Sequence, residues 1–144
     1  MPIQRVGHVV LKMRDLEQAK HFYHDILGMK ITDEREGAGI FFRFDDYHHD
    51  LAVFKVDDNS AGPQKNQVGL AHIALVVESL DEVKNFYHRL KAHDVPILGT
   101  SNHGYTKSVY CTDPEGNQLE IYCEGSDWHD FETMFIGEPL ELEN

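Results

Sequence analysis

The chain repeats itself at an offset of 64 residues, and this repeat constrains the fold more than any other feature of the sequence. When residues 8–31 are laid over residues 72–95 without a gap, seven of the 24 positions are identical. Unrelated sequences of average composition would match at about one or two positions. The repeat therefore predicts two copies of one supersecondary unit. The identical pairs are His8/His72, Leu11/Leu75, Leu16/Leu80, Lys20/Lys84, Phe22/Phe86, Tyr23/Tyr87 and His24/His88.

Each copy opens with the same local pattern of a strand followed by a helix. Apolar residues alternate along residues 6–13 and again along residues 70–77, which is typical of a strand. Asp15 and Ser79 then follow as helix N-caps, each with Gln or Glu three residues further on. Gly28 stands where the first helix should end. Apolar residues recur at helical spacing in both copies: Leu16, Ala19, Phe22, Tyr23 and Ile26, then Leu80, Val83, Phe86, Tyr87 and Leu90.

Three short strand segments follow each predicted helix, so the order of elements is βαβββ, twice. We therefore predict an α+β fold in which two βαβββ modules, at about 5–56 and 68–124, form a curled mixed sheet around a metal cavity. We expect one domain over residues 1–144, with a C-terminal tail at 125–144. The strand segments are roughly 29–36, 39–45 and 50–56 in the first copy and 95–100, 105–112 and 117–123 in the second.

Strand parity places three potential metal ligands on the sheet face that the helices leave uncovered. In the first strand of each copy the more apolar alternate residues should pack on the helix, so His8 and His72 face away. In the last strand Glu120 opposes an apolar set in the same way. A single strand histidine more often makes a structural hydrogen bond, and Glu120 alone could be an ordinary outward polar residue. The matched repeat position of the two histidines favours a shared metal site.

The repeat also predicts how many ligands the protein supplies. Aligning residues 45–54 with residues 113–122 places Ala52 on Glu120. A site that was symmetric about the repeat would have four ligands, two histidines and two carboxylates. Here the fourth ligand position, called the fourth corner below, is an alanine and has no carboxylate. Two neutral imidazoles and one carboxylate with open positions suit non-haem Fe(II). Mn(II) or Zn(II) could also occupy such a ligand set. We expect Fe(II) as the cofactor.

The composition argues against several classes of partner. A net charge of −12 disfavours binding to nucleic acid and to anionic membranes. No apolar run approaches the ~20 residues that span a bilayer, and the N-terminus has no apolar signal segment. The two cysteines, Cys111 and Cys123, fit a reducing compartment and a role as small core residues. We expect a cytoplasmic protein that is a homo-oligomer.

Two segments resemble a known family. The segment His103-Gly104-Tyr105-Thr106-Lys107-Ser108-Val109-Tyr110, followed by Asp113-Pro114, Gly116 and Glu120, is similar to the signature of extradiol dioxygenases. Ser101 departs from the residue type usual at its position in that signature. The segment His48-His49-Asp50-Leu51-Ala52-Val53-Phe54 resembles the strand that carries the active-site histidine of these enzymes. With its paired modules, the chain resembles the vicinal oxygen chelate superfamily, most of all a one-domain type I extradiol dioxygenase.

The resemblance implies a reaction and a role for each residue. It implies Fe(II)-dependent ring cleavage of a catechol-type aromatic by O₂, with iron bound by His8, His72 and Glu120. It also implies that His49 handles proton transfer, and that His103 and Tyr110 hydrogen-bond the catecholate. Strand parity would place His48 rather than His49 on the Ala52 face, so the choice between the two histidines stays open.

Two other functions are compatible with this sequence. A glyoxalase-like lyase or isomerase would use the same metal with a general base at the fourth corner, and Ala52 argues against the usual carboxylate there. A non-catalytic small-molecule binder of the same fold would not need the three ligands. The fold alone does not decide between these functions.

Overall fold

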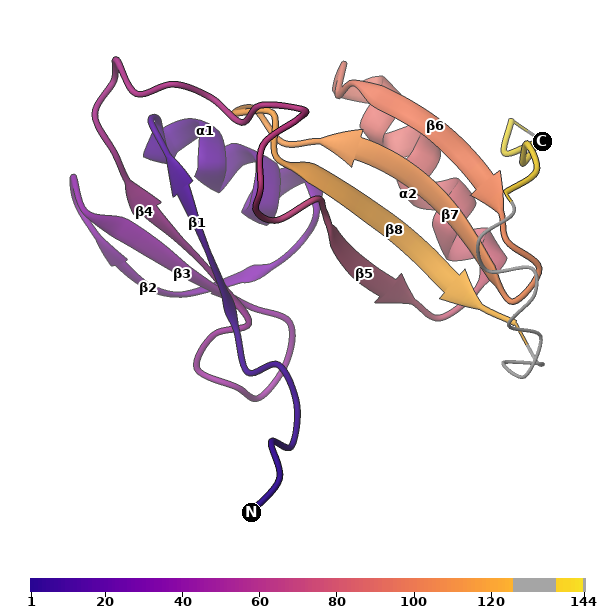
Figure 1. Cartoon of the computed structure of the whole chain (residues 1–144), viewed down its shortest axis with the longest axis horizontal. Coiled ribbons are helices and arrows are strands. Elements are labelled where there is room, and N and C mark those ends of the chain that lie inside the picture. The colour runs from indigo at the N-terminus through magenta and orange to yellow at the C-terminus, as the bar shows by residue number, and fades with distance from the viewer. Residues whose placement is uncertain (126–136, 144) are drawn as a thin grey trace. The chain divides into compact units, whose positions relative to one another are not determined.

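A computed structural model describes residues 1–125 and 137–143 of the chain. The chain forms two compact units, Met1–Gly62 and Pro63–Asn144 (Figure 1). Each unit has its own four-stranded sheet and its own helical segment. The α+β class predicted from the repeat is therefore confirmed.

The first unit is a βαβββ module whose first and last strands lie side by side. Its sheet has the order β1-β4-β3-β2, in which β1 and β4 are parallel and the other neighbours are antiparallel. The elements are β1 (Val9–Met13), the α-helix α1 (Leu16–Lys20), the π-helix η1 (His21–Ile26), β2 (Lys30–Arg35), β3 (Gly39–Arg43) and β4 (Leu51–Lys55).

The second unit repeats this topology. Its sheet has the order β5-β8-β7-β6, again with a parallel pair of first and last strands, β5 and β8. The elements are β5 (Ile73–Val77), α2 (Leu80–Ala92), β6 (Ile97–Asn102), β7 (Thr106–Thr112) and β8 (Gln118–Glu124). Both predicted modules are thus present in the predicted order.

The register of the two parallel pairs confirms the alignment drawn from the sequence. Val10 lies opposite Ala52 in the first sheet, and Ala74 lies opposite Glu120 in the second. Ala52 and Glu120 therefore occupy the same place in their sheets. The fourth corner predicted for a symmetric site is an alanine that is fully buried.

The helices begin where the caps predicted. The Asp15 side chain accepts a hydrogen bond from the Gln18 N–H, and the Ser79 hydroxyl accepts one from the Glu82 N–H. These bonds satisfy backbone donors that the first helical turn leaves unpaired. Among the described residues, none of the helices is long and apolar enough to cross a membrane.

The first helix differs from the regular helix that its apolar spacing predicts. After Lys20 the chain widens into the π-helix η1, in which the Leu27 N–H donates to the Phe22 carbonyl at 2.9 Å. The wider turn lets the adjacent Phe22 and Tyr23 both face the core, with 2% and 0% of their surface exposed. In the regular helix α2 the equivalent aromatic residues are only half-buried. Gly28, with φ of +82°, follows the helix as predicted.

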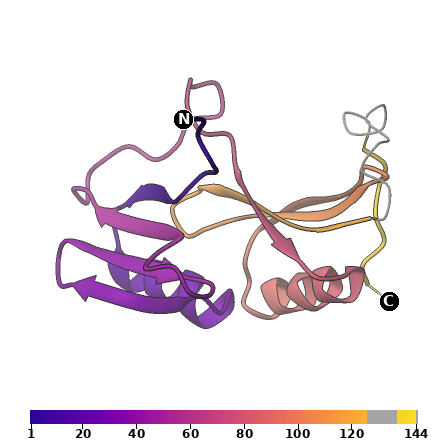
Figure 2. The ribbon, with the colours of Figure 1, turned by 90° about the horizontal axis from the view of Figure 1, so that it is seen from below.

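The helical segment of each unit covers one face of its sheet, and the core lies between them. Figure 2 shows α2 running along one side of the second sheet. The two cysteines are free and buried in this core, and burial raises the pKa of the Cys111 thiol to about 12. The core includes Met13, Tyr23, Ile40, Phe42 and Val53 in the first unit and Val83, Leu90, Val109, Leu119 and Ile121 in the second.

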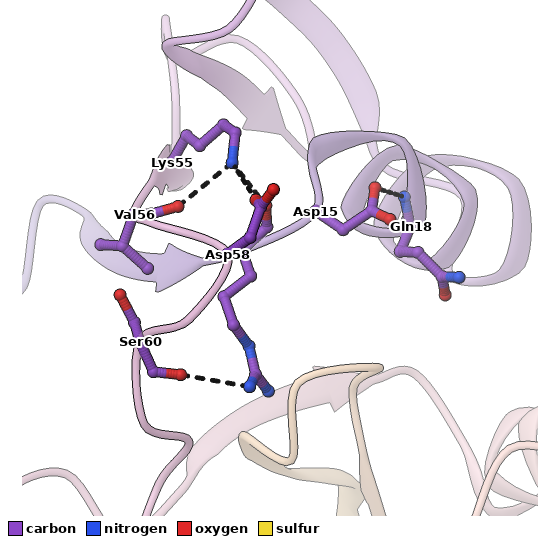
Figure 3. A network of polar contacts seen from close by, with 7 residues as sticks. Asp15, Gln18, Lys55, Val56, Asp58 and Ser60 are labelled. Atoms are coloured by element: carbon purple, nitrogen blue, oxygen red, sulfur yellow. Dashed lines mark hydrogen bonds and ion pairs between the residues drawn. The ribbon is translucent and has the colours of Figure 1, made fainter.

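Polar contacts fix the chain where it leaves β4. The Lys55 ammonium donates to the Arg14 and Val56 carbonyls and to the Asp58 carboxylate, at 2.9, 3.2 and 2.7 Å (Figure 3). The Arg14 guanidinium donates to the Ser60 carbonyl at 3.2 Å. The segment after β4 is thereby held against the end of β1.

The turn between β7 and β8 is organised by Asp113, which is 3% exposed. Its carboxylate accepts hydrogen bonds from the backbone N–H groups of Glu115 and Asn117 and from the Asn117 side chain, at 2.8–3.0 Å. Gly116, with φ of +92°, takes the left-handed conformation that the turn requires. This turn sets the register of β8 and thus the position of Glu120.

Replacing Asp113 should destabilise the hairpin that carries Glu120. Asp113→Ala removes the acceptor of two part-buried backbone N–H groups, so we expect the free energy of unfolding to fall by about 1–3 kcal/mol. Urea denaturation followed by circular dichroism measures this change. Asp46→Ala, at an exposed loop position, is the matched control and should leave the midpoint unchanged. Equal midpoints for the two variants would contradict the assignment.

Candidate metal and substrate site

Glu120 is a buried carboxylate on β8, and the neighbouring strand β7 supplies two hydroxyls to it. The residue is 9% exposed. Its Oε1 atom accepts hydrogen bonds from the Ser108 hydroxyl at 2.6 Å and from the Tyr110 hydroxyl at 3.2 Å. Ser108 and Tyr110 alternate along β7, so both side chains project from the same face of the sheet as Glu120. Strand pairing thereby brings these three side chains together, and the two hydrogen bonds join them.

The second carboxylate oxygen of Glu120 faces His72. The His72 Nε2 atom lies 3.1 Å from Glu120 Oε2. His72 directly precedes β5, which is the parallel neighbour of β8. Two donors at adjacent positions on one metal, with bonds of about 2.1 Å, lie roughly 3.0 Å apart. The pair therefore has both the chemistry and the spacing of two ligands to one divalent ion.

Tyr110 connects Glu120 to His103. The His103 Nε2 atom lies 3.2 Å from the Tyr110 hydroxyl oxygen. A tyrosine has one hydroxyl proton, and Tyr110 gives it to Glu120, so the Tyr110 oxygen accepts from an N–H of His103. The tautomer of His103 that fits both contacts carries its N–H on Nε2. Burial, followed by the nearby Glu120 charge, raises the pKa of Tyr110 and keeps its hydroxyl protonated.

The first unit brings three histidines together beside an aromatic ring. The His8 and His49 rings have their centroids 4.4 Å apart, and the Nδ1 atoms of His48 and His49 share a hydrogen bond of 2.9 Å. Phe41 lies against the rings of His48 and His49. Burial, followed by the charges of His8 and His48, lowers the pKa of His49. A neutral His49 can accept a proton.

The residues predicted from the sequence thus form two sets. His72, His103, Tyr110 and Glu120 lie together in the second unit, and His8 and His49 lie together in the first. Within either unit, the residues that the structure describes include no cluster of three His, Cys, Asp or Glu side chains suited to a metal ion. In the first unit the imidazole ring of His8 packs against that of His49.

Ser108 contacts Glu120, and the sequence pattern did not predict a role for it. It is fully buried and makes the shortest hydrogen bond to Glu120. Strand parity could have found it, because Ser108 shares the parity of Tyr110 on β7. From the sequence alone, a serine in an otherwise apolar part of a strand is interpreted as a small residue that the core tolerates. Its role becomes evident only from its hydrogen bond to Glu120 on β8.

Most of the chain matches the sequence model of one protein family. Residues 5–121 match the model of the Glyoxalase/Bleomycin resistance protein/Dioxygenase superfamily. The chain belongs to this superfamily. The predicted resemblance to vicinal oxygen chelate proteins is therefore confirmed.

Relatives within the superfamily include oxygenases and transferases. Biphenyl-2,3-diol 1,2-dioxygenases 2 and 3 of Rhodococcus globerulus are 26% and 31% identical, over 94% and 81% of this chain. A metallothiol transferase FosB of Staphylococcus saprophyticus is 27% identical over 83% of this chain and 77% of its own length. The chain spans 70% and 62% of the two dioxygenases and under half of some other dioxygenase relatives.

A solved lactoylglutathione lyase shares the fold. This protein from Agrobacterium tumefaciens is 25% identical, has a TM-score of 0.67, and aligns over 85% of this chain and 96% of its own. The superfamily thus includes dioxygenases, lyases and transferases. Membership sets the fold and leaves the reaction to be argued from the site.

Removing the Ser108 hydroxyl should weaken metal binding without unfolding the protein. Ser108→Ala deletes the 2.6 Å hydrogen bond that orients Glu120, and loss of such an orienting group typically costs roughly 10- to 100-fold in metal affinity. Titration with Mn(II) measures the change. Ser101→Ala is the matched control. It removes a hydroxyl at the paired position on β6 and leaves the hydrogen bond between Ser108 and Glu120 in place. Unchanged affinity in Ser108→Ala would show that Ser108 does not position the carboxylate.

Proposed function

We propose that this protein is an Fe(II)-dependent extradiol dioxygenase that cleaves a catechol-type aromatic. The observation that carries the proposal is the group in which Glu120 faces His72 through one oxygen and contacts Tyr110 through the other. In this proposal His72 and Glu120 bind the metal, and the Tyr110 hydroxyl and the His103 imidazole next to them can bind a phenolic oxygen. The two biphenyl-2,3-diol dioxygenase relatives support the choice of reaction.

The metal ligands in this proposal are His8, His72 and Glu120. The case for His8 rests on the repeat, because His8 directly precedes β1 as His72 directly precedes β5. Ala52, at the place equivalent to Glu120, offers no fourth ligand. Names of other relatives specify iron in one protein and manganese in another. We propose Fe(II), with Mn(II) or Zn(II) as the alternatives, since imidazole and carboxylate ligands accept all three.

The side chains around the ligands would bind the substrate and move its protons. A divalent metal bound here would supply Lewis-acid and redox chemistry toward the catechol oxygens and O₂. Tyr110, with its hydroxyl kept protonated, can turn its proton from Glu120 to a negatively charged substrate oxygen. His103 donates to the Tyr110 oxygen and strengthens it as a donor. Burial lowers the pKa of His49 and so favours its neutral form, which can accept the proton of a substrate hydroxyl.

A glyoxalase-like lyase or a thiol transferase is the second candidate. The Agrobacterium tumefaciens lyase structure and the FosB relative favour it. Ala52 argues against a lyase that needs a carboxylate at the fourth corner, because a buried alanine holds no base. A non-catalytic binder is a weaker candidate, because it gives no reason for a buried carboxylate with an imidazole beside it.

The ligand assignment predicts how metal content depends on single residues. His8→Ala, His72→Ala and Glu120→Ala should each lose most of the bound metal, because each removes one of three protein ligands. Metal analysis of anaerobically purified protein gives the stoichiometry, and circular dichroism checks the fold. His88→Ala is the control, since His88 is an exposed helix residue at a repeat-matched position. Full metal content in all three ligand variants would refute the assignment.

The proposed reaction predicts a loss of turnover in variants that keep their metal. Tyr110→Phe removes one hydrogen bond to developing charge, so we expect turnover to fall roughly 10- to 1000-fold. His49→Gln removes a proton acceptor, so we expect a loss of roughly 100-fold or more. Oxygen uptake by the Fe(II)-loaded protein, with catechol and biphenyl-2,3-diol as substrates, measures both effects.

A parallel assay separates the two candidate functions. Oxygen uptake with a catechol and the appearance of a yellow product support ring cleavage. Metal-dependent turnover of a glutathione hemithioacetal, with no oxygen uptake from any catechol, would instead identify a lyase. The same protein preparation serves both assays, so poor metal loading cannot produce the difference.

A further inference from the structure

The segment 137–143, called here the C-terminal strap, pairs with the edge strand β6. The N–H and carbonyl groups of Asn102 and Glu138 exchange two hydrogen bonds of 2.8 and 3.0 Å, as in an antiparallel ladder. The Thr100 hydroxyl donates to the Leu140 carbonyl at 2.7 Å. The strap thus covers backbone groups at the outer edge of the second sheet (Figure 1).

The far end of the strap is held on the helix α2. The Leu142 side chain is 1% exposed, so it is packed as tightly as a core residue. Tyr87 and Lys91, one turn apart on α2, both donate to the Glu143 carboxylate, at 2.8 and 3.0 Å. Backbone pairing, apolar burial and polar contacts therefore fix the strap at separate points.

The near end of the strap lies against His103. A Cβ atom added at Gly137 would overlap the Ser101 hydroxyl oxygen and would lie 3.1 Å from the Cε1 atom of His103. It would also lie 3.5 Å from Nδ1 of the same ring. A Cβ contact of 3.1 Å is tighter than an ordinary van der Waals contact, so the neighbouring atoms would have to move. Glycine at position 137 is what allows this close approach.

The His103 ring depends on such packing because its hydrogen bonding is incomplete. Its Nε2 atom contacts Tyr110, whereas its Nδ1 atom is buried and has no hydrogen-bond partner among the described residues. One hydrogen bond by itself does not fix the tilt of the ring about the Nε2–oxygen contact. The strap, lying against the Cε1 and Nδ1 edge, restricts that tilt.

We propose that the C-terminal strap is a positioning element for His103, with Gly137 as its decisive residue. By fixing the imidazole edge, the strap sets the direction from which His103 donates to Tyr110, and hence the orientation of the hydroxyl that serves the substrate. Its effect on turnover rests on the function proposed above. Its effect on the His103 ring does not depend on any reaction.

Nuclear magnetic resonance of the metal-free 144-residue chain tests the contact directly. Long-range ¹H–¹⁵N spectra report the imidazole nitrogens, and His103→Gln assigns the His103 signals by their disappearance. Gly137→Ala should shift the His103 signals. Gly99→Ala is the matched control on β6, where an added Cβ meets no atom within 4 Å, and it should leave them in place.

A second variant releases the strap without adding an atom beside the ring. Leu142→Ala removes the buried anchor, so it should shift the His103 signals while circular dichroism shows a folded protein. In the Fe(II)-loaded enzyme, both Gly137→Ala and Leu142→Ala should lower kcat roughly 10-fold, as expected for slight misplacement of a group near the substrate. Metal content should stay at the wild-type level in both.

The outcomes separate this proposal from the proposed function. Unmoved His103 signals in both Gly137→Ala and Leu142→Ala would overturn the positioning role, whatever the enzyme catalyses. Shifted signals in a wild-type background that consumes no oxygen with catechols would support the strap and reject the dioxygenase. Shifted signals with an unchanged kcat in an active enzyme would show that the strap does not act on turnover.

Discussion

The second unit depends on one buried carboxylate and the groups that make its burial tolerable. Glu120 lies on a strand whose neighbouring residues pack in the core, and an unpaired charge there would be costly. Ser108 and Tyr110 satisfy one oxygen, and His72 faces the other. Tyr110 in turn contacts the Nε2 atom of His103. The chemistry available to the site therefore follows from the way one acidic side chain is accommodated.

In the first unit, the position equivalent to Glu120 is occupied by a residue of different chemistry. Ala52 has the same place in the first sheet, where it is fully buried and needs no polar partner. The first unit instead has an aromatic ring and three histidines near its corresponding strand ends, and the charge of Asp50 acts on His49 there. The two copies have thus kept one backbone topology and acquired different electrostatic characters.

The sequence predicted those features that arise from short-range patterns repeated twice. Strand alternation and helix caps placed the elements and gave the faces on which His72 and Glu120 lie, because these signals span only a few residues. The π-helix could not be predicted in this way, since it results from burying the adjacent Phe22 and Tyr23 against a sheet that is distant in sequence. The strap was also missed, because backbone pairing between Asn102 and Glu138 leaves no mark in side-chain periodicity.

The parallel pairing of the first and last strands in each unit has a consequence for folding. Ile73 pairs with Leu119, which lies 46 positions further along the chain, so β5 cannot join its sheet until a long loop has closed. Contacts so distant in sequence slow folding compared with local hairpins. His72 and Glu120 meet only through this pairing. A nascent or partly unfolded chain therefore presents scattered side chains to any metal ion, and the imidazole and the carboxylate face each other only once β5 and β8 have paired.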